Sequence, residues 1–319
     1  MTLLAVPCEG ADVLALFDDE GTPRGRIPVG SDPVHATTAA GRVVVATMGE
    51  RSVTVVEPDG EVGRVATGVL GPAHLTRAAG RLLVPCTAGD AVAVIDPSTP
   101  TLEGRVPVGA EPHDVGRCGA HAIAGSRAGG VLTVFDPTTR SVVARHGVPD
   151  PGTARVQGVD RVRGAAGMAA VYAVDQGNDR VLLADRDGVR ARAAVGPDPY
   201  EATATPDRVY VPARGGDTVH EFAPDLSEGT VHETAAGPEG VVVVDGDPWV
   251  FHRDAPLLRS LDGTAVPLPA PSLAAATCPD GRVLLSHYDD DAVSLVDPAA
   301  GTVAWTVETP ARPFGSAVV

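Results

Sequence analysis

The sequence contains no lysine, so arginine supplies all 25 of its basic side chains. Without a lysine amine, the chain cannot form a Schiff base with a carbonyl substrate or with pyridoxal phosphate. Aromatic residues make up only 3% of the chain, which is too few for rows of rings that stack on bases. The formal net charge is −16, whereas a nucleic-acid-binding surface has to neutralise phosphates. The composition therefore argues against a nucleic-acid partner.

Long apolar runs are also missing. No stretch reaches 18 consecutive apolar residues, so we expect no membrane span. The opening residues, MTLLAVPCEG, lack the basic segment and the long apolar segment of a signal peptide. The four cysteines show no C-x-x-C spacing, so we expect them to be reduced and to hold no zinc. These features predict a cytoplasmic protein.

A repeat of about forty residues fills the chain. Segments 31–65, 70–106 and 110–146 each contain a strand that begins at a proline, two valine-rich strands, and a short fourth strand after a turn. The leading prolines are Pro33, Pro72, Pro112, Pro151, Pro199, Pro238, Pro271 and Pro313. The turns after the third strands lie at 18–21, 57–60, 96–99, 136–139, 185–188, 223–226, 261–264 and 297–300. Both markers occur eight times.

Eight units of this length predict an all-β fold, a single β-propeller of eight four-stranded blades spanning 1–319. Residues 1–27 contain three strands without a proline-led first strand, and 310–319 supplies one more strand. We expect these two ends to close one blade, which removes an open sheet edge. Seven blades is the alternative, because the unit 151–198 is long and the unit 238–270 is short and irregular.

The patterns VGAEPHDVG (108–116) and VLTVFDPTTRSVVAR (131–145) resemble the YVTN-type β-propeller repeat. The resemblance covers nearly the whole chain and implies a fold rather than an activity, because YVTN-like propellers include binding proteins, lactonases and lyases.

Polar side chains recur where each blade begins and where its second strand ends, and in a propeller these two points lie on the same face. The first group is His35, His74, Glu111, His113, Asp114, Tyr200 and Glu201, and the second is Arg127, Asp175, Arg214, His252, Arg253, His287 and Tyr288. Three consecutive blades contribute His35, His74 and His113, so we expect these histidines to form an arc. Imidazoles beside carboxylates can transfer protons, and the three histidines are the predicted ligands for a divalent metal.

The triplet Glu111-Pro112-His113 is similar to one found in streptogramin lyases. In those propellers a Glu and a His of such a triplet work with a divalent metal. The resemblance implies metal-assisted elimination or ring opening at Glu111 and His113, although this chain has none of the Trp-Phe-Thr strands of those lyases.

The leading hypothesis is therefore an enzyme that transforms a small molecule without an organic cofactor, of the lyase, cyclase, isomerase or hydrolase type. Its catalytic residues would be His35, His74, His113, Glu111, Asp114 and Glu201, and Tyr200, Arg127, Arg214, His252, Arg253, His287, Tyr288 and Asp175 would bind the substrate. The arginines have an alternative role in salt bridges with Asp175, Asp217 or Asp254.

Two other functions stay open at this point. One is a non-catalytic propeller that binds a ligand or a partner protein, and the other is a lactonase-type hydrolase. The lysine-free composition, rich in Ala, Val and Arg, is typical of a GC-rich genome such as that of an actinobacterium, where specialised-metabolite biosynthesis is a plausible setting.

Overall fold

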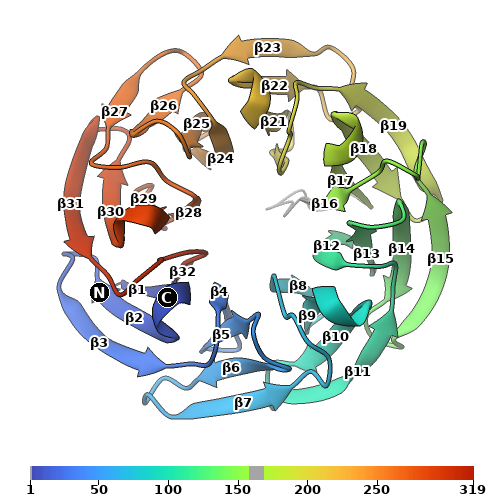
Figure 1. Ribbon diagram of the computed structural model, residues 1–319, viewed down its shortest axis with the longest axis horizontal. Coiled ribbons are helices and arrows are strands. Elements are labelled where there is room, and N and C mark those ends of the chain that lie inside the picture. The colour runs from blue at the N-terminus through green and yellow to red at the C-terminus, as the bar shows by residue number, and fades with distance from the viewer. Residues whose placement is uncertain (1, 158–168) are drawn as a thin grey trace. The chain divides into compact units, whose positions relative to one another are not determined.

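The computed structural model describes residues 2–157 and 169–319. Within these ranges the strands form eight four-stranded sheets, and neighbouring strands pair antiparallel (Figure 1). The chain divides into two units, Met1–Arg64 with Thr234–Val319 (unit 1) and Val65–Glu233 (unit 2). Segment 158–168 of the fourth predicted repeat lies outside the described residues.

Unit 1 contains four of the sheets, and one of them joins the beginning of the chain to its end. In that sheet β1 pairs with β32, through Leu4 opposite Val318 and Ala5 opposite Ala317. The strands of unit 1 are β1 (Leu3–Cys8), β2 (Val13–Asp18), β3 (Pro23–Pro28) and β32 (Ala317–Val318); β4 (Pro33–Ala39), β5 (Arg42–Thr47), β6 (Ser52–Val56) and β7 (Val62–Ala66, whose last two residues fall in unit 2); β24 (Pro238–Val244), β25 (Asp247–His252), β26 (Leu257–Ser260) and β27 (Ala265–Pro267); and β28 (Ala274–Thr277), β29 (Val283–His287), β30 (Ala292–Asp297) and β31 (Thr302–Glu308).

Unit 2 contains the other four sheets, which follow one another in chain order (Figure 1). Its strands are β8 (Thr76–Ala78), β9 (Arg81–Cys86), β10 (Ala91–Asp96) and β11 (Thr101–Pro107); β12 (Pro112–Cys118), β13 (His121–Ser126), β14 (Val131–Asp136) and β15 (Ser141–Gly147); β16 (Val156–Gln157), β17 (Ala170–Asp175), β18 (Arg180–Asp185) and β19 (Gly188–Ala194); and β20 (Thr203–Ala204), β21 (Val209–Ala213), β22 (Thr218–Phe222) and β23 (Thr230–Glu233).

The predicted fold class is confirmed: the chain is an all-β propeller of eight four-stranded blades, one of which is closed by strands from both ends. The alternative of seven blades is wrong. The unit 238–270, which is short in sequence, still supplies the four paired strands β24 to β27.

The hydrophobic core lies between neighbouring blades, because each sheet is apolar on both of its faces. In unit 2, Leu83 and Val92 of one blade form a cluster with Val115 and Phe135 of the next. Phe135 and Leu83 are completely buried. Small β-branched side chains suit this packing, since they fit closely on the pleated surface of a strand.

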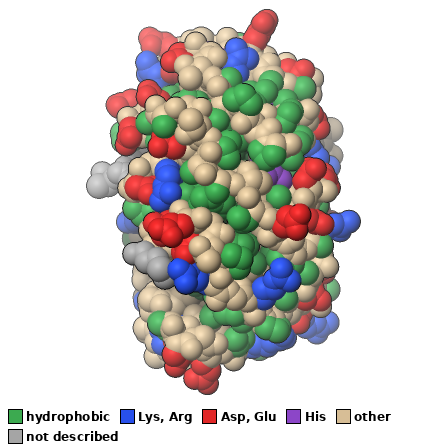
Figure 2. Space-filling view, turned by 90° about the vertical axis from the view of Figure 1, so that its left-hand side faces the viewer, with side chains coloured by type: hydrophobic (Ala, Val, Ile, Leu, Met, Phe, Trp, Pro, Cys, Tyr) green, Lys and Arg blue, Asp and Glu red, His purple; other side chains and the backbone are tan. Residues whose placement is uncertain are grey.

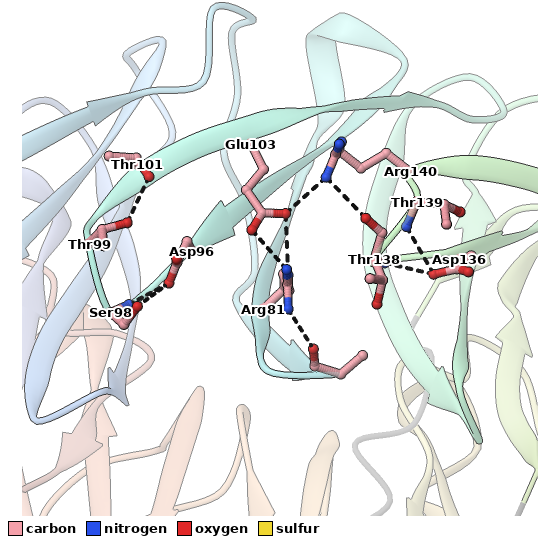
Figure 3. A network of polar contacts seen from close by, with 11 residues as sticks. Arg81, Asp96, Ser98, Thr99, Thr101, Glu103, Asp136, Thr138, Thr139 and Arg140 are labelled. Carbon is pink, nitrogen blue, oxygen red and sulfur yellow. Dashed lines mark hydrogen bonds and ion pairs between the residues drawn. The ribbon is translucent and has the colours of Figure 1, made fainter.

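Polar contacts join the same two blades near their outer strands (Figure 3). Glu103 of β11 forms ion pairs with Arg81 of its own blade and with Arg140 of the following blade, both at 3.0 Å. In the turns after the third strands, Asp96 and Asp136 accept hydrogen bonds from the residues that follow them. These bonds lower the pKa of both carboxyl groups, mainly through Ser98 for Asp96 and through the Thr138 amide for Asp136.

The outer strands carry the solvent-exposed surface. Along β31 every second residue is exposed, and β3 is exposed over nearly all of its length. Figure 2 shows a side of the molecule on which Asp, Glu and Arg side chains are interspersed with apolar ones. Such a mixture is typical of a solvated face.

Five short 3₁₀ helices follow second strands of the blades. They are η1 (Glu9–Ala11), η2 (Thr87–Gly89), η3 (Gln176–Asn178), η4 (Arg214–Gly216) and η5 (Tyr288–Asp290). Across the described ranges, no helix has the length and apolar character needed to cross a membrane.

Each of these helices ends on an aspartate in the left-handed conformation, which Asp tolerates better than most residues. Four of the carboxylates accept a hydrogen bond from the backbone N–H of the residue before the next blade's proline. These blade-linking aspartates are Asp12, Asp90, Asp179 and Asp291, which bond to Asp32, Glu111, Asp198 and Arg312 at 3.1, 3.0, 3.1 and 2.8 Å.

We expect Asp90→Ala to lower the free energy of unfolding by roughly 1–2 kcal/mol, because alanine loses the acceptor and strains the left-handed backbone. Asp90→Asn keeps a carbonyl oxygen and tolerates this conformation, so it should cost less. Urea unfolding of both variants beside the unsubstituted chain measures the difference. Equal midpoints for all three proteins would contradict a stabilising role for this bond.

Candidate functional site

Two histidines and an aspartate come together at the start of two neighbouring blades of unit 2. The Oδ1 atom of Asp114 lies 3.6 Å from Nδ1 of His74, and its Oδ2 atom lies 3.1 Å from Nδ1 of His113. The two imidazole rings are 4.6 Å apart between centroids and are tilted by 53°. The side chains are largely buried, with 18% of His74, 14% of His113 and 12% of Asp114 exposed. We call this group the His/Asp cluster.

A β-bulge in β12 brings His113 and Asp114 to the same place. Pro112 pairs with Ser126 and Val115 pairs with Ala124, so two residues of β12 lie opposite the single residue Gly125. In a regular strand, consecutive side chains point to opposite faces. The bulge breaks this alternation, which lets an imidazole and the next carboxylate contact each other.

His74 reaches the cluster from the preceding blade, and η2 holds the two blades together at this point. His74 lies between Pro72, which forms a bridge with Cys86, and the start of β8. The Thr87 hydroxyl donates to the carbonyl of Pro112 at 3.0 Å, and Asp90 accepts from the Glu111 amide. These two bonds fix the two residues before His113 against the blade that carries His74.

The cluster can bind a divalent metal or transfer protons. One ligand atom from each of His74, His113 and Asp114 lies within 4.8 Å of the other two, and imidazole nitrogens with a carboxylate oxygen suit zinc and similar ions. Alternatively, a carboxylate that accepts from Nδ1–H leaves Nε2 of the same ring with a lone pair, which can accept a proton from a substrate.

The other residues predicted to be catalytic lie outside this group. His35 is in β4 of unit 1, 6% exposed, and forms a bridge with Gly315. Glu111 is exposed and has a left-handed backbone, and its main chain bonds to Asp90 and to the Arg127 amide. Glu201 is half-buried just before β20.

Three of the residues predicted to bind substrate are completely buried and hydrogen-bonded within the fold. His252 contacts the carbonyl of Leu257 and the Thr234 hydroxyl. His287 contacts the Ser294 hydroxyl at 2.7 Å, and Asp175 pairs with Arg180 at 2.7 Å. This placement leaves none of the three side chains with exposed surface for a ligand.

Four further residues that were predicted to bind substrate form pairs with groups of their own unit. They are Tyr200, Arg214, Arg253 and Tyr288. The Arg214 guanidinium lies over the Tyr200 ring, 3.5 Å from its centroid. Arg253 lies 3.8 Å from Glu239 and 4.0 Å from Asp254.

The Tyr288 hydroxyl donates to Glu9 at 2.8 Å. Burial, together with the Glu9 carboxylate, raises the pKa of Tyr288 to about 12.

Arg127 stands apart from these residues. It follows β13 and donates its backbone N–H to the carbonyl of Glu111 at 3.2 Å, beside the residues that carry the His/Asp cluster. Its Nε atom is shielded from solvent and has no hydrogen-bond partner among the described residues.

The blade-linking aspartates, of which Asp90 positions this site, were not among the residues predicted from the sequence. Their signal is present, because Asp12, Asp90, Asp179 and Asp291 each stand four residues after the last residue of a second strand. A comparison across the repeats of the position four residues after each second strand would have revealed them.

No family model matches the chain, and no curated protein matches its sequence. Solved structures do resemble it. They include dihydro-heme d1 dehydrogenase NirN in complex with DHE (TM-score 0.79, 14% identity, 98% of this chain and 74% of that chain covered) and AztD from Citrobacter koseri (0.71, 12%, 100% and 97%). A streptogramin B lyase is a third (0.66, 10%, 79% and 89%).

At these identities the likeness establishes the fold and leaves the activity open. Propellers related to streptogramin lyases, expected from the Glu-Pro-His triplet, are thus among the structural neighbours. The YVTN-type resemblance has no matching family model.

We expect His287 to make the fold sensitive to acid. Burial lowers its pKa in the folded chain below the ordinary value of 6.5. At a pH between the folded-state pKa and 6.5, the unfolded chain binds a proton that the folded chain does not. This contribution to stability is complete above pH 6.5 and is lost as the pH falls toward the folded pKa. Urea unfolding at pH 7 and pH 5 should show a smaller acid effect in His287→Gln than in the unsubstituted chain. An unchanged acid effect would contradict this assignment, and His121→Gln is the control.

The cysteines should be unreactive in the folded protein. All four are free and buried, and burial raises the pKa of Cys8 to about 12 and of Cys86 and Cys278 to about 11. Since the thiolate is the nucleophile, iodoacetamide should label the native chain slowly at pH 7.5 and all four sites after unfolding. Rapid labelling of Cys8 in the native protein, located by mass spectrometry, would contradict its burial.

Proposed function

We propose that the chain is an enzyme that transforms a small molecule, with His74, His113 and Asp114 as its catalytic residues. The single observation that carries this proposal is the Asp114 carboxylate, whose two oxygens face the Nδ1 atoms of two imidazoles. Two titratable rings on one carboxylate form a set of groups that can bind a metal and move protons.

The donor set fits a divalent cation, because two nitrogens and a carboxylate oxygen converge within 4.8 Å. His74, His113 and Asp114 would hold the ion. A bound ion would supply Lewis-acid polarisation of a substrate oxygen.

The chain's own residues supply the rest of the chemistry. Asp114 fixes the orientation of both rings and offsets the positive charge of an imidazole that has accepted a proton. One ring can take a proton from the substrate while the other returns a proton to the leaving group or to a neighbouring carbon. These are the proton transfers of lyases, cyclases and isomerases. We favour this class over a lactonase-type hydrolase, which requires an activated water in addition.

Binding without turnover is the competing function, and it would use the same three residues. Two of the structural neighbours carry enzyme names, a dehydrogenase and a lyase, and a third, AztD, does not. The difference between the two functions therefore has to be measured.

We expect the metal-stripped chain to take up about one Mn²⁺ or Zn²⁺ ion, because the cluster offers one complete set of donors. Asp114→Asn should weaken this binding by at least about tenfold. The matched control is His232→Gln, which removes a histidine from another His–carboxylate pair, 2.8 Å from Glu221, and should bind metal like the unsubstituted chain. Isothermal titration calorimetry measures all three.

Turnover separates an enzyme from a binding protein. The chain is incubated with a set of small lactones and β-substituted carboxylic acids, and ¹H NMR follows more than one product molecule per chain. Turnover that Asp114→Asn loses supports the proposal. Metal binding without turnover of any compound in the set would favour the binding function, and equal metal binding by Asp114→Asn would overturn the site itself.

A further inference from the structure

We propose that the substrate is an anion and that Arg127 binds its carboxylate or phosphate group. This inference rests on the proposed function of the His/Asp cluster and adds the class of substrate. It is carried by a cation in the same blade as His113 and Asp114, whose buried Nε–H has no acceptor among the described residues.

The position of Arg127 follows from the strand ladder. Ser126 pairs with Pro112, the residue directly before His113, and the Arg127 amide donates to the carbonyl of Glu111. Arg127 therefore extends the pairing of β13 with β12 by one residue beyond Ser126. It lies at the end of the blade where the bulge in β12 carries His113 and Asp114. The Ser126 hydroxyl bonds to the carbonyl of Ala110 at 2.6 Å and fixes this crossing.

The Arg127 side chain is half-buried, and its Nε–H is shielded from solvent without a hydrogen bond. A donor that has lost its water without gaining an acceptor is costly, and a charged donor is more costly than a neutral one. Such groups are rare in native proteins and call for an explanation, and a ligand that brings the missing acceptor is the one proposed for Arg127.

Other arginines of unit 2 show the usual solution. Arg81 and Arg140 share Glu103, Arg180 pairs with Asp175, and Arg190 pairs with Asp185. Within the part of the chain that the structure describes, no carboxylate oxygen lies within 4.0 Å of the Arg127 guanidinium. Arg127 therefore lacks, among the described residues, the carboxylate partner that these four arginines have.

The chemistry of the guanidinium identifies the missing group. Its Nε–H and an adjacent Nη–H form a planar fork that matches two oxygens of one carboxylate or phosphate. A neutral substrate would leave the charge uncompensated. In a chain of net charge −16, with Asp90, Glu111 and Asp114 nearby in the two blades, an anionic ligand needs such a local cation to bind at all.

The test uses inorganic phosphate and succinate as probes, with three substitutions: Arg127→Gln, Arg127→Lys, and Arg117→Gln as the control. Arg117 is an exposed arginine of the same blade, in β12, and its Nε atom donates to the Gly119 carbonyl at 3.5 Å. Calorimetry on the metal-free proteins measures anion binding. We expect Arg127→Gln to weaken the better of the two probes at least about tenfold, Arg127→Lys to recover part of the affinity, and Arg117→Gln to change nothing.

A second readout places the anion beside the cluster. In the Mn²⁺-loaded protein, the ³¹P signal of bound phosphate should broaden, and Arg127→Gln should abolish this broadening while Mn²⁺ binding, followed by electron paramagnetic resonance, stays unchanged. Equal anion affinity in Arg127→Gln and the unsubstituted chain would overturn the inference even if Mn²⁺ binds.

If Mn²⁺ does not bind but anion binding depends on Arg127, the metal part of the proposed function fails and the assignment of Arg127 stands. The preference between phosphate and succinate then decides which oxyanion the site takes. Failure of both probes to bind the unsubstituted chain would also overturn the inference.

Discussion

The hydrogen bond from the Glu111 amide to the Asp90 carboxylate determines where β12 begins, and the site depends on that point. Asp90 can make this bond because it closes η2 in a left-handed conformation, which directs its short side chain toward the next blade. The Thr87 hydroxyl holds the carbonyl of Pro112 from the same 3₁₀ turn. Because Glu111 and Pro112 are both held in place, the position of the bulge that follows is set. The directions of the His113 and Asp114 side chains are set with it. Related bonds at Asp12, Asp179 and Asp291 show that the fold uses this aspartate–amide bond repeatedly, and the His/Asp cluster lies beside one of its copies.

The bulge itself is not special to the blade that carries His113 and Asp114. Register shifts follow the leading proline in β4 and in β24 as well, at Pro33 and at Pro238. In those blades the extra residues are Val34 and Glu239, both buried. A geometry that recurs for reasons of blade assembly therefore becomes a site only where the sequence places an imidazole and a carboxylate next to each other at the bulge.

The sequence predicted the fold well because each blade repeats two local signals, a leading proline and a turn after the third strand. It predicted that His74, His113 and Asp114 share one end of the blades, because this follows from the alignment of the repeats. It could not predict burial at the ends of the second strands. His252 and His287 occupy the same repeat position as Cys8, Thr47 and Cys86, and all five side chains are buried. A buried column that accepts small polar residues in most blades also accepts a histidine when serine or threonine hydroxyls pair with its ring nitrogens, as Ser294 does for His287. Whether such hydrogen bonds can form depends on residues of neighbouring strands and on the strand register. An alignment of single positions contains neither.

Asp114 also sets a limit on how the two imidazoles can be charged. One carboxylate offsets one imidazolium, while a second proton would place two positive rings 4.6 Å apart with a single negative charge between them. The carboxylate therefore contacts two imidazoles, and each imidazole can act as an acid or as a base. Under the proposed function, this arrangement can remove a proton at one atom of a substrate and deliver a proton at another. A divalent cation would bring two positive charges to the same donor atoms, so metal binding and protonation of a ring are alternative uses of one cluster. An anion bound to Arg127 leaves the charge of the His/Asp cluster unaltered, because the positive charge of the arginine offsets the negative charge of the anion.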